Sequence, residues 1–393
     1  MTEFFTNLIE LIKKTLVSVG PQQRAPRMRC RRGLCFYAKK VLATAIILCI
    51  GAIVGTARWL WNLCMHRRHG KASLEATDAV FITGCDSGFG LLLATALAEE
   101  GVVVIAGCLT AEGVKRASAL GPSASALRLD VTKESSIAAC AQKVAARLAS
   151  SGCTLRAIVN NAGIGTASLV DWTSLDEYRR IADVNLWGLI AVTRAFLPLL
   201  RASTCLSGKD STTTTSFAAP TRRVINVSSI AGRLSLASTS AYAISKHGVE
   251  AFSDALRREV KAFGIDVVTI SPGFFATQIT DSTMQTARSR ALWNKAPAEA
   301  KASYGAAFFD AHIAAFASIV NRLTDTAPGK VVNALYDAIR WRSPQPHVLV
   351  GRDAHMLWAP IAQLPAALTD AAVTADLFPV PPAGAIAQQQ FFF

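Results

Sequence analysis

The chain has 393 residues, of which 51% are hydrophobic and 17% charged, and it carries a formal net charge of +14. This apolar composition excludes a disordered protein and favours a large buried core or a membrane segment. The charge lies near the N-terminus: residues 11–74 hold thirteen Lys or Arg and no acid, whereas from Glu75 onward 28 basic residues face 25 acidic ones. The charge therefore gives no support to nucleic-acid binding, and we expect no nucleic-acid partner.

Residues 41–63 are predicted to form one membrane-spanning helix. Val41–Ala57 contains no charged side chain, and at 1.5 Å per residue it gives about 26 Å of helix. Trp59 and Trp61, beside basic residues, extend this length to the bilayer core of about 30 Å. A buried core helix is the alternative interpretation. The span divides a basic N-terminal segment, residues 1–40, from a linker, residues 64–75.

The basic residues around this span indicate the membrane topology and the compartment of the protein. Nine precede the uncharged stretch Val41–Ala57 and four follow it, so the positive-inside rule favours a cytosolic N-terminus. We expect a single-pass protein of the endoplasmic reticulum membrane. The acid-free, Arg-rich stretch at 24–32 keeps a mitochondrial membrane open as the alternative. The nine cysteines form neither a CxxC pair nor a regular framework, so neither a metal site nor a disulfide scaffold is expected.

From Ala79 onward, short apolar strands alternate with helical patterns. Strands are predicted at 79–83, 102–106, 125–130, 157–160, 223–228 and 266–270, and the main helices at 88–100, 174–201 and 240–263. This alternation predicts an α/β fold of the Rossmann type, a doubly wound parallel sheet in three αβα layers, with ligands at the carboxyl ends of the strands.

Residues 76–352 are interpreted as a single domain. Within it, the polar stretch 203–221 predicts a flexible insertion, because it has too little apolar surface to pack. Residues 353–393 form an apolar tail, rich in Ala and Pro. Its segment Met356–Ile361 either lies on a membrane or closes over the ligand site.

A glycine-rich turn follows the first strand, in the pattern TGxxxGxG from Thr83 to Gly90. Gly84 permits the tight turn, Gly88 lets the backbone approach a pyrophosphate, and Gly90 lets the next helix pack closely on the sheet. The N-terminus of that helix offers amide donors to a phosphate. The position of the glycine-rich turn between a strand and a helix predicts a dinucleotide-binding site.

Further polar motifs follow the next strands. Asn160-Asn161-Ala162-Gly163 ends a strand, Asn185 lies in the long helix, and Tyr242 follows Ser229 by thirteen residues. Tyr242 and Lys246, four residues apart, share one helix face, so the lysine ammonium can lower the tyrosine pKa toward working pH.

These motifs, in this order, resemble the short-chain dehydrogenase/reductase family over about residues 76–352. TGCDSGFG, AGCLT at 106–110, VNLWG at 184–188 and EAFSDALRRE at 250–259 are similar to the subgroup of retinol, 17β-hydroxysteroid and mitochondrial 3-hydroxybutyrate dehydrogenases. The resemblance implies that Tyr242 is the general acid/base, Lys246 its partner and a ribose ligand, and Ser229 the donor to the substrate oxygen. Asn185 would hold Lys246 in a water-linked proton relay.

The resemblance also implies which residues bind the cofactor. Asp130 would contact the adenine, Asn160 and Gly163 the adenosine and ribose, and Thr277 the nicotinamide carboxamide. The full set implied is Thr83, Gly84, Ser87, Gly88, Phe89, Gly90, Asp130, Val131, Asn160, Ala162, Gly163, Tyr242, Lys246, Pro272, Gly273 and Thr277. A homodimer or homotetramer formed through the long helices is expected.

NAD is the expected cofactor, with NADP not excluded. No Arg or Lys lies among residues 107–111 to pair with a 2′-phosphate, and Asp86 in the glycine-rich turn would repel one. The reaction implied is hydride transfer between an alcohol carbon and the nicotinamide, with the hydroxyl proton passing to Tyr242.

A substrate lid is predicted at residues 278–320. Apolar side chains within it are expected to select a small apolar alcohol or ketone, a retinoid or steroid: Met284, Leu292, Trp293, Tyr304, Phe308 and Phe309. The same residues could instead be a packing stripe. Two other functions stay open, a 3-hydroxybutyrate dehydrogenase of mitochondria and a catalytically silent membrane-bound scaffold of the same fold.

Overall fold

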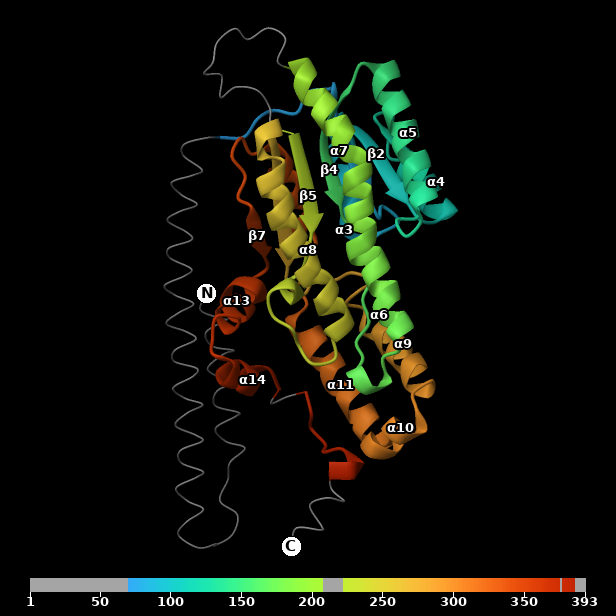
Figure 1. Ribbon diagram of the computed structural model, residues 1–393, viewed down its shortest axis with the longest axis vertical. Helices are drawn as coiled ribbons and strands as arrows, with labels where there is room; N and C mark the ends of the chain where they lie inside the picture. Colours follow the sequence, from blue (N-terminus) through green and yellow to red (C-terminus); the bar gives the residue numbers. More distant parts are fainter. Residues whose placement is uncertain (1–69, 208–221, 375–376, 386–393) are drawn as a thin grey trace, which may run out of the picture. The chain divides into compact units, whose positions relative to one another are not determined.

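Seven short apolar segments pair into one parallel β-sheet, in the order β3-β2-β1-β4-β5-β6-β7 (Figure 1). The strands are β1 Asp78–Thr83, β2 Val103–Cys108, β3 Ala124–Arg128, β4 Thr154–Asn160, β5 Arg222–Val227, β6 Ile265–Pro272 and β7 His347–Val350. This computed structural model describes residues 70–207, 222–374 and 377–385. The predicted membrane span at 41–63, the segment 1–40 and most of the linker lie outside the described residues.

Helices cover both faces of the sheet, which confirms the doubly wound fold. Helices α3 (Gly88–Glu99) and α12 (Gly329–Arg340) pack side by side on one face, α3 against β1 and β2 and α12 against β5, β6 and β7. Helices α5 (Glu134–Ser151), α7 (Gly188–Ser207) and α8 (Ser240–Glu259) cover the other. The strands are buried on both faces, which explains why they read as continuous apolar runs.

The strand order reverses between β1 and β4, the position at which open α/β sheets bind ligands. Three helices lie beyond the carboxyl ends of the strands in Figure 1: α9 (Ser282–Asn294), α10 (Ala298–Tyr304) and α11 (Ala306–Leu323). The remaining elements are α4 Ala111–Ser118, η1 Val170–Trp172, α6 Leu175–Ala182, η2 Asp183–Trp187, η3 Ile230–Gly232, η4 Lys261–Phe263, η5 Ala354–Trp358, α13 Ala359–Ile361 and α14 Ala366–Thr374.

The helix predicted at 174–201 is interrupted. It consists of α6, one turn of π-helix (η2) and α7. The π turn adds a residue to the helix, and a sequence that is apolar on most faces gives no sign of this. Helix α7 also continues to Ser207, so the predicted insertion begins later than 203, and 208–221 lies outside the described residues.

Within the described residues, the stretch Leu175–Ala202 is long and apolar enough to cross a membrane. Its apolar side chains are used differently here, because Val192, Phe196 and Leu200 of α7 are fully buried against β4 and β5. The stretch is thus a core helix of the sheet. Cys85, Cys108 and Cys140 are buried, and these three and Cys153 are free, which fits small core residues.

Candidate active site

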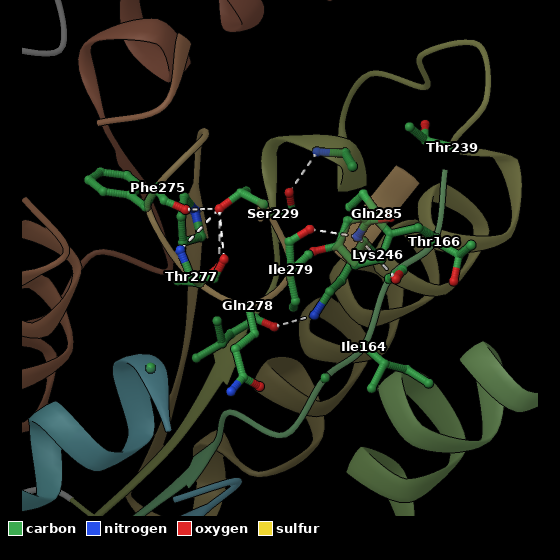
Figure 2. A pocket seen from close by; sticks show the side chains of 18 of the residues that line it. Ile164, Thr166, Ser229, Thr239, Lys246, Phe275, Thr277, Gln278, Ile279 and Gln285 are labelled. Atoms are coloured by element: carbon green, nitrogen blue, oxygen red, sulfur yellow. Dashed lines mark hydrogen bonds between the residues drawn. The ribbon is translucent and has the colours of Figure 1, made fainter. Parts of the chain in front are cut away.

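A cavity of about 670 Å³ opens at the carboxyl ends of the central strands. Residues that follow β1, β4, β5 and β6 form its polar end, and α9, α11 and the segment after β7 form the other. Figure 2 shows side chains from these segments, among them Ser229, Lys246 and Thr277, lining the same pocket. The cavity therefore joins the two regions in which the sequence predicts cofactor and substrate.

The glycine-rich turn between β1 and α3 lines the polar end. Gly84 has φ +69°, and a Cβ there would lie 2.7 Å from the Ala162 Cα. Gly88 has φ +61° and open space where a Cβ would stand, so backbone can be approached from the cavity. Ser87, the N-cap of α3, makes no side-chain cap hydrogen bond. The first amides of α3 are thus available to an anion in the cavity.

Thr83 and Asn161 hold this turn in place. The Thr83 hydroxyl accepts hydrogen bonds from the backbone N–H groups of Asn161 and Ala162, at 3.0 and 3.1 Å. The Asn161 side chain donates to the carbonyls of Thr83 and Gly84. Asn161 carries no role in the sequence prediction, although it stands in the same Asn-Asn-Ala-Gly motif.

Three predicted cofactor ligands lie outside the cavity wall. Asn160 is buried and donates to Thr193 Oγ1 and Asn226 Oδ1, both at 2.8 Å, so it ties β4 to α7 and β5. Thr83 is buried beneath the turn, and a Cβ on Gly90 would lie 2.6 Å from the Gly84 carbonyl oxygen. In this structure these three residues shape the loop that the cavity exposes, and their contact with a cofactor stays a prediction.

Asp130 and Val131 line the cavity beyond β3. Asp130 Oδ1 accepts hydrogen bonds from the backbone N–H and the hydroxyl of Thr132, and the hydroxyl bond is the largest of the effects that lower its carboxyl pKa. The side chain is therefore oriented and ionised where an adenine would lie.

Asp86 reaches from the glycine-rich turn to the end of β2. Its carboxylate accepts hydrogen bonds from Leu109 N, Thr110 N and Thr110 Oγ1, at 2.7, 2.8 and 2.6 Å. Gly113 makes room for it, since a Cβ there would lie 2.3 Å from Asp86 Oδ1. An acidic group thus stands at the end of the second strand, although the residue in the strand itself is Cys108.

Ser229, Tyr242 and Lys246 lie together on the cavity wall. Ser229 Oγ accepts a hydrogen bond from Ala231 N, which leaves the serine proton free to be donated. Lys246 Nζ lies 5.7 Å from the centre of the Tyr242 ring and donates to the Val227 carbonyl at 2.8 Å. The three side chains predicted from the sequence are therefore brought together.

The pKa values of this group differ from the sequence expectation. Burial raises the pKa of Tyr242 to about 12, and a hydrogen bond with Ser229 opposes that rise. Burial also lowers the pKa of Lys246 to about 8, while the charge of Glu250 opposes that fall. In this geometry Lys246 Nζ donates to the Val227 carbonyl and not to the Tyr242 hydroxyl.

Asn185 projects inward from η2 and is fully buried. Its Nδ2 donates to the Ile164 carbonyl and to Ser245 Oγ, and its Oδ1 accepts from Ile164 N. The side chain thus ties the loop after β4 to the helix that carries Lys246. The side chain makes no direct hydrogen bond to Lys246, so the water-linked relay stays a prediction.

The turn after β6 brings Pro272, Gly273 and Thr277 to the cavity. Asp353 anchors this turn: its Oδ2 accepts a hydrogen bond from Phe274 N at 2.8 Å, and a Cβ on Gly273 would lie 2.1 Å from it. Asp353 was assigned to the separate apolar tail, yet it supports the loop predicted to hold a carboxamide.

The lid contains two different sets of apolar side chains. Trp293, Phe308 and Phe309 pack with Trp172 into a separate cluster, with Leu292 and Tyr304 against it, and Met284 is exposed. The cavity is lined instead by Ile313, Phe316, Ala317 and Val320 of α11 and by Leu234 and Leu236. Five of the six residues predicted to select substrate are thus a packing stripe, and the wall was missed because α11 is apolar on most faces.

The segment after β7 closes part of this wall. Trp358 lines the cavity and packs with Ile230 and Leu234. Farther along, His312 Nδ1 lies 2.7 Å from the Leu377 carbonyl, and Nε2 lies 2.6 Å from Ser238 Oγ. Because a carbonyl only accepts, Nδ1 carries the proton and Nε2 accepts from the serine. Of the two possibilities for the tail, Trp358 supports closure over the site.

The polar end of the cavity fits a dinucleotide. The first amides of α3 and the glycine backbone can face a pyrophosphate. Asp86 and Asp130 can face ribose hydroxyls or adenine, and Lys246 lies in the wall. Gly84, Ser87, Gly88, Phe89, Asp130, Val131, Ala162, Gly163, Pro272, Gly273 and Thr277 all line it, as do Tyr242 and Lys246.

Fold and site together define a short-chain dehydrogenase, and the family profile described as short chain dehydrogenase matches residues 78–288. The chain belongs to this family and is an oxidoreductase. It is similar to retinol dehydrogenase 5 of Mus musculus, with 36% identity over 330 residues that cover 83% of this chain and 95% of that protein. Retinol dehydrogenase 7 of Rattus norvegicus is 38% identical over 325 residues, covering 82% and 95%.

Solved structures show the same fold. A short-chain dehydrogenase from Streptomyces avermitilis matches with a TM-score of 0.54 and 26% identity, covering 70% of this chain and 89% of that one. A short-chain dehydrogenase/reductase from Burkholderia phymatum, solved in complex with NAD, matches with a TM-score of 0.55 and 21% identity, covering 70% and 90%.

Proposed function

We propose that the protein is a membrane-anchored, NAD-dependent dehydrogenase that interconverts an apolar alcohol, of the retinoid or steroid kind, with its carbonyl. The observation that carries this proposal is the position of Ser229, Tyr242 and Lys246, between a dinucleotide-shaped polar end and an apolar wall of one cavity. The names of the related retinol dehydrogenases support the substrate class.

The side chains can move the hydroxyl proton. Ser229 Oγ donates a hydrogen bond to the substrate oxygen, since the bond that it accepts from Ala231 N leaves its proton available. Tyr242 Oη takes the proton from the alcohol in oxidation and returns it in reduction. Lys246 keeps two N–H donors free after its bond to Val227, and its charge favours the phenolate. The bound nicotinamide supplies the hydride chemistry, and its positive charge in the oxidised form also favours the phenolate.

The cavity favours an apolar alcohol over a hydroxy acid. Among the described residues that line it, Lys246 is the one cation, and its Nζ already bonds Val227. A short hydroxy acid would need a positive partner for its carboxylate. The α11 wall offers Ile313, Phe316 and Val320 instead, so we place the 3-hydroxybutyrate alternative second.

NAD is proposed over NADP because of Asp86. Its carboxylate lines the cavity at the end of β2, where it would accept hydrogen bonds from ribose hydroxyls and repel a 2′-phosphate. Two other parts of the proposal concern the membrane and the oligomeric state. Anchoring in the endoplasmic reticulum, with a mitochondrial membrane as the alternative, rests on residues 41–63. A homodimer or homotetramer rests on apolar residues exposed on the long helices, Trp187 and Ile244.

The decisive experiment is turnover by Tyr242→Phe. Loss of the phenol removes the acid/base, so kcat should fall by about 10²–10⁴-fold while NAD still binds. Tyr336→Phe is the control, because Tyr336 lies on α12 beside Glu100, outside the cavity wall. The measurement uses retinol, estradiol, androstane alcohols and 3-hydroxybutyrate, each with NAD and NADP. Near-normal turnover by Tyr242→Phe would overturn the assignment, and a wild type that turns over none of them would favour a silent scaffold.

A further inference from the structure

Glu250 is a largely buried acid on the same face of α8 as the catalytic pair. Tyr242, Lys246 and Glu250 follow one another at four-residue intervals, so each lies one helical turn beyond the last. The Glu250 side chain is 14% exposed. It does not line the cavity, and the function proposed above gives it no part.

Several elements converge on this carboxylate. Ser271 Oγ, from β6, donates to Oε1 at 2.7 Å, and His347 Nδ1, from β7, lies 3.2 Å from Oε2. Arg233 Nη2 lies 3.9 Å from Oε2. Burial opposes ionisation, but the hydrogen bonds with His347 and Ser271 and the charge of Arg233 outweigh it and lower the Glu250 pKa. The group is thus held as a carboxylate.

Glu250 also touches the turn that carries Ser229. A Cβ on Gly232 would lie 2.8 Å from Ser228 Oγ, 2.9 Å from the Lys246 carbonyl oxygen and 3.0 Å from Glu250 Cγ. Glycine therefore lets this turn pack directly on α8 between Lys246 and Glu250. The Glu250 side chain thus packs next to both the turn that carries Ser229 and the backbone of Lys246.

A negative charge at this place selects between two forms of the catalytic pair. When the pair has lost one proton, either Lys246 is an ammonium and Tyr242 a phenolate, or both are neutral. The two forms have the same net charge, but Glu250 is one turn from Lys246 and two turns from Tyr242. The nearer carboxylate stabilises the ammonium more than it disfavours the phenolate.

We propose that Glu250 is a positioning residue that keeps Lys246 as an ammonium while Tyr242 gives up its proton. This inference rests on the proposed function, since it needs Tyr242 and Lys246 to be the proton-transfer pair. Without the carboxylate, the balance of the singly deprotonated pair would shift further toward the neutral, unreactive form. The loss would appear at alkaline pH, where the pair is deprotonated.

The test is the pH profile of kcat/KM for alcohol oxidation by the full-length protein carrying Glu250→Gln. The alkaline plateau should fall about tenfold, the size of a one-unit change in this balance. The apparent pKa of the profile should also fall, because removal of a negative charge eases the first deprotonation. Rates on the acid limb should stay near those of the wild type.

Asp254→Asn is the matched control. Asp254 lies one further turn along α8, also contacts His347, at 3.1 Å, and pairs with Arg257 and Arg258. Its removal should leave the profile unchanged. The NAD dissociation constant and melting temperature of both variants separate a lost fold from a lost charge. A profile for Glu250→Gln that is unchanged, or scaled equally at all pH values, would overturn the inference.

Arg233→Gln keeps the inference testable if Glu250→Gln does not fold. Arg233 is partly exposed, and its loss leaves the carboxylate less neutralised, so the apparent pKa should move upward, opposite to the Glu250 variant. No shift in that variant would count against the inference. Tyr242→Phe distinguishes the two levels: if it stays active, the proposed function fails, whereas if it is inactive and the profile does not move, only the role of Glu250 fails.

Discussion

Asp86 shows how one side chain can supply a charge that its neighbours along the chain do not. It belongs to the glycine-rich turn, but its hydrogen bonds to Leu109 and Thr110 place the carboxylate at the end of β2. Arg116 approaches from the other side and donates to the Asp86 carbonyl at 2.8 Å. The carboxylate and the guanidinium thus both stand near the proposed position of the adenosine ribose, where NADP carries a 2′-phosphate and NAD a hydroxyl.

Replacement of Asp86 by Asn should therefore change cofactor preference. Loss of the negative charge removes the repulsion of a 2′-phosphate, and Arg116 remains to attract one. The ratio of kcat/KM for NADP to that for NAD should rise about tenfold, equivalent to about 1.4 kcal/mol.

Steady-state kinetics with each cofactor measures this ratio. Glu112→Gln, an exposed acid in the first turn of α4, is the control and should leave it unchanged. An unaltered ratio in the Asp86 variant would assign cofactor choice to other groups.

At this scale the sequence predicted the side chains that carry chemistry but not all of their contacts. Spacing alone placed Tyr242 and Lys246 on one helix face. The burial of Asn160 and the role of Asn161 depend on which side of the β4 end faces the cavity, and adjacent Asn residues do not reveal that. The sequence pattern assigns Glu250 no role, because its hydrogen-bond partners, Ser271 and His347, lie far away in the sequence.

The lid shows what helical periodicity can and cannot decide. Helix α11 carries apolar side chains on several faces, so the same pattern fits a cavity wall and a core. The structure separates them: Phe316 lines the cavity, whereas Phe308 packs with Trp172, Trp293 and Phe309.

Alanine at each phenylalanine should give opposite results. Phe316→Ala should raise KM for a long apolar alcohol about tenfold or more, because bound substrate loses apolar contact, with little change in stability. Phe308→Ala should cost about 3–5 kcal/mol of unfolding free energy and leave KM nearly unchanged.

Urea denaturation and steady-state kinetics on the same two proteins provide the comparison. Equal effects on KM would mean that the two side chains do not belong to separate apolar groups.

At the scale of the whole molecule, the alternation of strands and helices was sufficient to predict the fold. Buried strands on a parallel sheet read as continuous apolar runs, and the glycine-rich turn fixed where the first strand ends. Strand β7 is four residues long and begins after a loop, so no periodic signal marks it. The extra turn residue in η2 also leaves no trace in composition.

The N-terminal region supports a prediction about the full chain. Deletion of residues 1–63 removes the only predicted span, so the shortened protein should leave the membrane pellet and appear in the supernatant. Its kcat for a water-soluble alcohol should match that of the full chain, because the residues that line the cavity lie in 84–358.

Deletion of residues 1–40 is the matched control, since it keeps 41–63 and should stay in the pellet. Fractionation after an alkaline wash makes the measurement. A 1–63 deletion that still pellets would place the membrane attachment in the remainder of the chain.

The bond between His312 and Leu377 also bears on the order of events during synthesis. These residues are 65 positions apart, and Leu377 follows every strand of the sheet. A ribosome has therefore produced the glycine-rich turn, Tyr242 and Lys246 well before it produces the carbonyl that receives the histidine proton. The nascent sheet can form first, and the α11 wall reaches its final support only afterwards. The polar end of the cavity can thus form on a nascent chain before the α11 wall is complete.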